Sequence, residues 1–270
     1  MNETPGAPLK RVLVAIDPAA ECRSALEMAA RLAAQSQAEL VGLFVEESEL
    51  LTAATLPMTR ILRGHDLAEE ALDRARMERG LRAWAAQAEA ILSSAAARWR
   101  VKASFRVARG RIAEALLAEA AQTDLLALGT VGRPTQRRRV GTTAREIVRQ
   151  APCTLLISRG DGSSERPVRL LFEGNAAALR LADQLARLHD SPLEVLVTSP
   201  HRAQAEAWAR AHGRRTTVQV LAQADPNVVA ERLQRDATGI AILERKGALG
   251  AAIDAEGLLA GTVSSIVLVG

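Results

Sequence analysis

The chain has 270 residues, of which 48% are hydrophobic and 24% charged, and its formal net charge is +4. This length accommodates two domains of ordinary size, and the apolar fraction supports a buried core. No run reaches the roughly 18 apolar residues of a membrane-spanning helix, and residues 1–10 lack the apolar centre of a signal peptide. The only two cysteines, Cys22 and Cys153, are expected to be free buried thiols in a cytoplasmic protein.

The basic charge does not by itself predict a nucleic-acid partner. Arginines are mixed with glutamate in helical stretches such as residues 74–79, as on solvated helix faces. Aromatic residues make up only 2% of the chain and tyrosine is absent, so no stacking platform for single strands is expected. One arginine cluster, Arg137, Arg138 and Arg139, lies in a glycine-rich loop, where it either contacts phosphate or keeps the loop soluble. We predict neither a nucleic-acid nor a membrane partner.

The first half of the sequence alternates apolar runs with helical patterns. Apolar runs without polar alternation are typical of buried parallel strands, which we expect at residues 11–17, 39–45, 101–108, 125–129 and 153–158. Helices are expected at residues 24–36, 66–99, 112–122 and 142–150, and a loop at residues 46–64. This alternation predicts an α/β domain with a parallel sheet.

Three residues end predicted strands and should meet at one edge of the sheet. Right-handed crossovers bring the carboxyl ends of parallel strands together, and open α/β sheets bind ligands at that edge. Asp17, Val45 and Gly129 occupy these positions. Asp17 has an alternative role as a cap of the next helix, and Val45 would suit an apolar strand in any fold.

A glycine-rich stretch follows the fourth strand. It begins Gly129-Thr-Val-Gly132, and after eight further residues continues with Gly141-Thr142. Glycines allow close backbone approach to an anion, and the free N–H groups of a helix start can receive a phosphate. The stretch is therefore either a nucleotide cradle or an ordinary strand-to-helix turn in which Thr142 caps the helix.

The second half repeats the first after a polar linker at residues 159–167. Residues 168–173 match 12–17, residues 178–193 match 25–40, and residues 238–243 match 123–128. A brief helix near 203–211 replaces the long one, and residues 262–269 supply the last strand. We predict domains at 1–160 and 161–270, packed as a pseudo-dimer.

The motifs of the first half resemble the universal stress protein family in its two-domain form. The resemblance rests on Val14-Ala-Ile-Asp17, on Leu43-Phe-Val45, and on Gly129-x-x-Gly132 followed by Gly141-Thr142. It implies two tandem open parallel-sheet domains, Rossmann-like and similar to the adenine nucleotide alpha hydrolases. It also implies a regulatory protein of the stress response.

The resemblance further implies a site for ATP, with or without Mg²⁺, or for a related adenine nucleotide. The first aspartate and the valine would contact the adenosine part, and the loop amides and threonine hydroxyl would hold the phosphates. With the flanking residues and two loop arginines added for their charge, the candidate site is Asp17, Val45, Leu128, Gly129, Gly132, Arg137, Arg138, Gly141, Thr142 and Thr143.

Two features depart from the family pattern. Eight residues separate Gly132 from Gly141, where the family has nine, so the Gly141 amide shifts by up to the reach of one residue, roughly 3.5 Å. The turn after Asp17 also reads Pro18-Ala-Ala and lacks the Gly-Ser often found there.

The second half lacks the site. Glu244 replaces the first glycine, and its carboxylate would repel a phosphate by roughly 4 kcal/mol at about 4 Å. Gly247 remains at the second glycine position, but the loop after it is too short. Glu173 stands in the place of Asp17, and without the loop we expect it to have nothing to complete. This half is expected to be structural.

No catalytic set is evident. The four histidines (His65, His189, His201 and His212) are unpaired with metal ligands in sequence, and no Gly-x-x-x-x-Gly-Lys-Ser/Thr motif is present. We predict a binder rather than an enzyme, with at most slow incidental ATP hydrolysis. The first hypothesis is a nucleotide-responsive regulatory module with an unidentified protein partner and a possible homodimeric state. The alternative is a nucleotide-independent interaction protein whose contact face is the 66–99 helix.

Overall fold

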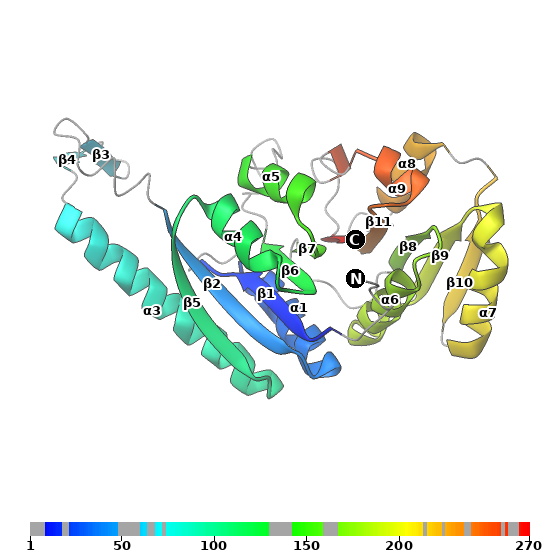
Figure 1. The fold of residues 1–270 in the computed structure, drawn as a ribbon, viewed down its shortest axis with the longest axis horizontal. Coiled ribbons are helices and arrows are strands. Elements are labelled where there is room, and N and C mark those ends of the chain that lie inside the picture. Colours follow the sequence, from blue (N-terminus) through cyan, green and yellow to red (C-terminus); the bar gives the residue numbers. More distant parts are fainter. Residues whose placement is uncertain are drawn as a thin grey trace.

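The computed structural model describes residues 9–17, 22–47, 60–63, 68–71, 74–129, 142–158, 167–212, 215–222, 225–234, 239–254, 257–258 and 265–270. Within these residues one sheet of ten strands crosses the molecule in the order β10-β9-β8-β11-β12-β7-β6-β1-β2-β5 (Figure 1). Its pairings are parallel, except that β12 and β7 pair antiparallel. The predicted α/β class with open parallel sheets is confirmed.

The N-terminal lobe comprises the five strands on one side of this antiparallel pairing. They are β1 (Arg11–Ala15), β2 (Glu39–Glu47), β5 (Ala103–Gly110), β6 (Leu125–Gly129) and β7 (Thr154–Ser158). Its helices are α1 (Cys22–Ser36), α3 (Arg74–Trp99), α4 (Ile112–Ala120) and α5 (Thr142–Gln150).

The C-terminal lobe has the same strand order as the N-terminal lobe when both are counted outward from the β7–β12 junction. Its strands are β8 (Val168–Phe172), β9 (Leu193–Val197), β10 (Thr216–Val220), β11 (Ile240–Glu244) and β12 (Ser265–Val269). Its helices are α6 (Ala176–Leu188), the 3-10 turn η1 (Ser199–His201), α7 (Arg202–His212), α8 (Pro226–Gln234) and α9 (Ala248–Ala252). The order β12-β11-β8-β9-β10 matches β7-β6-β1-β2-β5, so the repeat predicted from sequence is present in the fold.

The centre of the sheet is buried on both faces, which explains why its central strands are mostly apolar. One hydrophobic cluster joins the sheet to α1, α3 and α6 through residues such as Leu32, Leu92 and Leu185. The other joins the opposite face to α4, α5, α8 and α9. Helices on both faces of a mostly parallel sheet define a doubly covered, Rossmann-like architecture.

The two lobes are joined by backbone pairing and by helix contacts. Val267 of β12 pairs with Leu156 of β7 at the centre of the antiparallel junction. On one face α1 packs against α6, and the Arg31 guanidinium donates to the carbonyl of Leu188 at the end of α6. The same guanidinium lies over the Trp99 ring, 5.4 Å from its centroid. The lobes therefore pack as the predicted pseudo-dimer.

The structure corrects the boundary of the long helix. It was expected from residue 66, but α3 begins at Arg74, and residues 68–71 form strand β4 (Ala68–Ala71). This strand pairs antiparallel with β3 (Arg60–Arg63), inside a stretch expected to be a loop. Half of residues 66–73 are apolar, at positions 67, 68, 71 and 72, which is the spacing of an amphipathic helix and explains the expectation. In the structure residues 68–71 instead satisfy their backbone groups by local pairing with β3.

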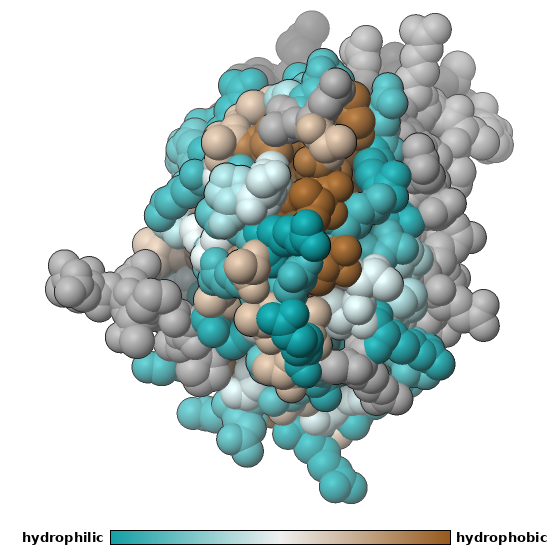
Figure 2. Space-filling view, turned by 90° about the vertical axis from the view of Figure 1, so that its right-hand side faces the viewer, coloured by the Kyte–Doolittle hydropathy of each residue, from teal (hydrophilic) through white to brown (hydrophobic). Residues whose placement is uncertain are grey.

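At the far end of the C-terminal lobe, β10 is the last strand of the sheet among the described residues, and exposed apolar side chains lie near it. Figure 2 shows a strip of hydrophobic residues on this side of the molecule, bordered by hydrophilic ones. Two valines of the region are well exposed, Val220 of β10 at 36% and Val228 of α8 at 48%. Neither β10 nor α8 was predicted from sequence. Their patterns are short, and this end of the sheet is less deeply buried than its centre.

Candidate functional site

The strand order of the N-terminal lobe reverses between β1 and β6. From β1 the chain moves through β2 to β5 on one side, then returns to β6 and β7 on the other. Helix α1, which follows β1, covers one face of the sheet, and α5, which follows β6, covers the opposite face. The carboxyl ends of β1 and β6 therefore diverge at a topological switch point, the place where open α/β sheets bind ligands.

Three predicted site residues lie at one level along this edge. The register places Ala15 opposite Leu43 and Val14 opposite Ala127, so the chain reaches Asp17, Val45 and Gly129 at nearly the same height. Asp17 is exposed just beyond β1, whereas Val45 is partly buried within β2 and Gly129 ends β6. The fold thus places Asp17 and Gly129 on either side of the switch point, with Val45 one strand further along.

The remaining predicted residues divide into three groups. Leu128 is only 7% exposed and packs in the hydrophobic cluster, so only its backbone can face the edge. Thr142 and Thr143 open α5, whose first N–H groups have no acceptor within the helix. The other four lie outside the described residues: Gly132, Arg137, Arg138 and Gly141.

Sequence reasoning missed two polar contacts at this edge. The hydroxyls of Ser24 and Ser158 are 2.9 Å apart and link the start of α1 to the end of β7, where Ser158 pairs with Gly129. Beside Val45, the nearly buried Glu46 carboxylate accepts from the Arg109 guanidinium at 2.8 and 3.0 Å. Ser158 and Glu46 both lie at carboxyl ends of strands. Asp17 was selected because it follows the carboxyl end of a strand, and the same criterion would have selected Ser158 and Glu46.

Cys22, at the start of α1, is a poor nucleophile. Its thiol donates to the Ala15 carbonyl at 3.3 Å and is 6% exposed. Burial raises the pKa of the Cys22 thiol to about 11, and the nearby Asp17 carboxylate adds to the effect. Burial also raises the pKa of Cys153, and both cysteines are free and buried, as predicted. Thiolate chemistry at the edge is therefore disfavoured.

The corresponding edge of the C-terminal lobe is arranged differently. Val12 pairs with Leu125 in one lobe as Val168 pairs with Ile240 in the other, so Asp17 corresponds to Glu173 and Gly129 to Glu244. Glu244 is 4% exposed, and burial raises the pKa of its carboxyl group. Its carboxylate oxygens accept from the amides of Glu173 and Asn175 at 2.9 and 3.0 Å.

Glu173 also has backbone partners, which corrects the expectation that it has nothing to complete. Its carboxylate accepts from the amide of Leu249 at 2.8 Å and from that of Gly250 at 2.7 Å. These donors belong to α9, which follows Glu244. The two carboxylates thus saturate four amides at the carboxyl edge of this lobe.

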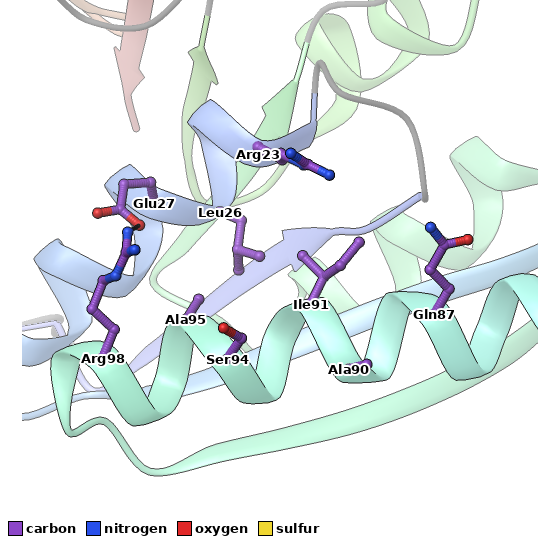
Figure 3. Close-up of a pocket in the computed structure, with 9 residues that line it drawn as sticks. All are labelled: Arg23, Leu26, Glu27, Gln87, Ala90, Ile91, Ser94, Ala95 and Arg98. Carbon is purple, nitrogen blue, oxygen red and sulfur yellow. Dashed lines mark ion pairs between the residues drawn. The ribbon is translucent and has the colours of Figure 1, made fainter.

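A second concave surface lies between α1 and α3. Figure 3 shows its residues, and the cavity has a volume of about 480 Å³. Its floor is apolar (Leu26, Ala90, Ile91 and Ala95) and its rim is polar (Arg23, Glu27, Gln87, Ser94 and Arg98). Arg98 forms a 3.7 Å ion pair with Glu27, which also accepts from the Trp99 indole at 2.9 Å.

Neither metal chemistry nor a membrane span is indicated in the part of the chain that the structure describes. Among those residues no group of three or more histidine, cysteine, aspartate or glutamate side chains is placed to hold a metal ion. No described helix is long and apolar enough to cross a membrane. His189 caps α6, and His212 at the end of α7 stacks on Trp208, so both have structural roles.

The doubly covered parallel sheet and its switch point define a Rossmann-like α/β protein. A model of the universal stress protein family matches residues 8–159, more than half of the chain. The chain therefore belongs to the universal stress protein family, as the motifs predicted.

Two solved structures share the fold over nearly the full length. A universal stress protein from Archaeoglobus fulgidus DSM 4304 is 12% identical with a TM-score of 0.65, covering 96% of this chain and 97% of its own. A putative universal stress protein from Pseudomonas aeruginosa UCBPP-PA14 is 16% identical with a TM-score of 0.60, covering 97% and 93%. At these identities the likeness shows the fold alone. No match was found among curated proteins.

Proposed function

We propose that the N-terminal lobe binds ATP or a related adenine nucleotide and that the protein acts as a regulator in the stress response. The observation that carries the proposal is the convergence of Asp17, Val45 and Gly129 at the switch point between β1 and β6. An exposed carboxylate at this position can accept hydrogen bonds from a ribose or an adenine amino group. The apolar Val45 offers a surface for the base.

The start of α5 supplies the means to hold phosphates. The helix has nine residues, and the amides of Thr142 and Thr143 lie in its first turn, where the helix dipole favours an anion. Arg137 and Arg138 would add charge from the preceding loop. The residues present therefore fit an adenine nucleotide, and Mg²⁺ would reach the site with its phosphates.

A binding experiment tests this function directly. Calorimetric titration of the full chain with ATP and Mg²⁺ should give a saturable isotherm, and Asp17→Asn should weaken binding at least about tenfold, because a hydrogen bond to a charged group is lost. Gly132→Val should abolish binding. Glu89→Gln, an exposed acid on α3 remote from the edge, is the matched control and should bind as the wild type does. Absence of heat and of a thermal shift at millimolar ATP would refute the proposal.

The loop arginines can be tested with two ligands. Replacing Arg137 and Arg138 together by alanine should weaken ATP far more than adenosine, because only ATP carries phosphate charge. An equal loss for both ligands would show that these arginines do not act on the phosphates.

The other attributes of the proposal follow from the same site. We propose a binder with at most slow incidental hydrolysis, because the sequence has no Gly-x-x-x-x-Gly-Lys-Ser/Thr phosphate loop to supply the lysine and metal-binding hydroxyl of an ordinary ATPase. The buried free thiols support a reducing, cytoplasmic location. The remaining partner would be a protein, with a homodimer as one possible assembly, rather than a nucleic acid or a membrane.

The cavity between α1 and α3 favours a second candidate function, a nucleotide-independent interaction protein. Trp84 is 49% exposed on α3 and lies seven residues before Ile91, so it extends the apolar floor by two helical turns. Arg23 and Arg98 flank that floor (Figure 3). An amphipathic helix with acidic flanks would be the complementary partner.

Site-specific cross-linking distinguishes this second candidate. A photoreactive group at Ser94, in the cavity, should capture a partner that the same group at Glu89, on the opposite side of α3, does not. The purified partner should then lose affinity for the Trp84→Ala variant. Equal capture from both positions would exclude the cavity as the contact surface.

A further inference from the structure

We infer that Glu173 and Glu244 are built-in anions that take the place of a bound phosphate in the C-terminal lobe and so restrict the protein to one nucleotide per chain. The inference rests on the proposed function for its N-terminal comparison. Its structural part, a carboxylate clamp across β8, β11 and α9, stands on the geometry of the C-terminal lobe alone.

The first step is positional. The two glutamates occupy the places of Asp17 and Gly129 in the pseudo-symmetric sheet, at the carboxyl ends of β8 and β11. Where the N-terminal lobe has a glycine, which has no side chain, the C-terminal lobe has a carboxylate. Because Glu244 is 4% exposed, that carboxylate fills the position rather than extending into solvent.

The second step is the use of the amides. Glu173 reaches across to α9 and accepts from Leu249 and Gly250, residues 76 and 77 positions later in the chain. Glu244 reaches back to the β8–α6 turn and accepts from the amides of Glu173 and Asn175. Backbone N–H groups at such an edge would otherwise be available to an external anion. Here each of these four already donates to a carboxylate of the chain.

The third step is that other atoms pack closely against two glycines, Gly247 and Gly250. A Cβ atom on Gly247 would lie 2.0 Å from Oε2 of Glu173. A Cβ atom on Gly250 would lie 2.0 Å from the backbone oxygen of Glu244 and 3.2 Å from the same Oε2. The second glycine of the family motif is thus retained at position 247, but it closes around an internal carboxylate. Among the described residues, the Glu173 carboxylate itself therefore occupies the space against the start of α9.

Amide hydrogen exchange of the full chain tests the clamp without any nucleotide. In Glu173→Ala the amides of Leu249 and Gly250 should exchange at least tenfold faster, whereas the amide of Asn175, held by Glu244, should change less. Glu173→Gln keeps one acceptor oxygen and should deprotect only one of the two amides. Glu206→Ala, which removes a partly exposed acid that pairs with Arg202 in the same lobe, is the control. Unchanged exchange at residues 249 and 250 in both Glu173 variants would overturn the clamp.

A pair of substitutions tests the same contact if Glu173→Ala unfolds too readily for exchange measurements. Gly247→Ala should lower the urea midpoint in the wild-type background, because its methyl group collides with the Glu173 carboxylate. Combined with Glu173→Gly, the same substitution should cost much less, since every Glu173 side-chain atom near the new methyl group is gone. Additive effects would contradict the proposed geometry.

Nucleotide stoichiometry tests the functional consequence. Titration with ATP and Mg²⁺ should saturate at one nucleotide per chain, and Asp17→Asn should weaken that single event. Two equivalents bound to the wild type would overturn the inference and leave the proposed function intact. No binding at all would refute the proposed function, and the exchange experiment would then decide the clamp by itself.

Discussion

Gly42 lets α3 pack close to the sheet. The substitution Gly42→Ala adds one methyl group at this contact and tests how closely the helix and the sheet are packed. Gly42 lies at the centre of β2, opposite Val14 of β1. A Cβ atom at this position would lie 2.7 Å from Cδ1 of Ile16 and 2.7 Å from Cδ2 of Leu92. Carbon atoms pack best at roughly 3.5–4.0 Å, so the methyl group overlaps two core side chains by about 1 Å.

The magnitude follows from two opposing effects. Overpacking of this kind costs about 1–3 kcal/mol, while replacing a glycine in a strand by alanine returns about 0.5–1 kcal/mol of conformational entropy. We therefore expect Gly42→Ala to destabilise the fold by about 0.5–2 kcal/mol. At about 2–4 °C per kcal/mol for a protein of this size, the Tm should fall by roughly 1–8 °C.

Gly80 provides the matched control. It lies within α3, and a Cβ atom there would meet nothing within 4 Å. Gly80→Ala should therefore raise stability by about 0.8–1 kcal/mol through helix propensity. The assay is thermal and urea unfolding of both variants, followed by circular dichroism. If Gly42→Ala is as stable as the wild type or more so, α3 does not contact the sheet as closely as we describe.

Three further predictions concern charge and titration. The pKa of Cys22 is raised in the fold to about 11 from 9.0, so the unfolded chain loses this proton at lower pH than the folded protein does. The free energy of unfolding should therefore fall as pH rises from about 9 to about 11. The urea midpoints of Cys22→Ala should fall less steeply over that range. Arg109→Met leaves the nearly buried Glu46 carboxylate without its partner and should lower the free energy of unfolding by about 1–3 kcal/mol. In a double-mutant cycle, Arg109→Met combined with Glu46→Gln should recover part of that free energy. Arg31→Met removes the donor to the Leu188 carbonyl and the contact with Trp99, and should lower the free energy of unfolding by about 1 kcal/mol and change the tryptophan fluorescence spectrum; an unchanged free energy of unfolding would show that the α1–α6 junction does not depend on this arginine.

Much of the fold could be predicted because its central strands are buried on both faces. The apolar runs that became β1, β2, β6 and β8 are unambiguous, and the helices between them impose parallel pairing. The strands at the edges of the fold were harder to predict from the sequence. Strand β10 is partly exposed, so its residues show no apolar run, and the β3–β4 hairpin depends on local pairing that a helical pattern concealed.

Some features of the candidate site could likewise be predicted from the sequence, and others could not. The ends of the apolar runs are visible in sequence, so Asp17, Val45 and Gly129 could be selected from that pattern alone, but strand β2 itself continues past Val45 to Glu47. The hydrogen bond between Ser24 and Ser158 could not, because these hydroxyls lie 134 residues apart and meet only when α1 packs beside β7.

The sequence by itself determined the alternation of strands and helices, the tandem repeat and the loss of the glycine at position 244, because burial and backbone conformation constrain residue type locally. Only the tertiary structure decided what replaced the lost site. Glu173 finds its donors in α9, more than seventy residues away, since the parallel order of β8 and β11 brings their carboxyl ends together. No sequence pattern shows which backbone amides a carboxylate will contact, because the pairing depends on the edge that the two strands share.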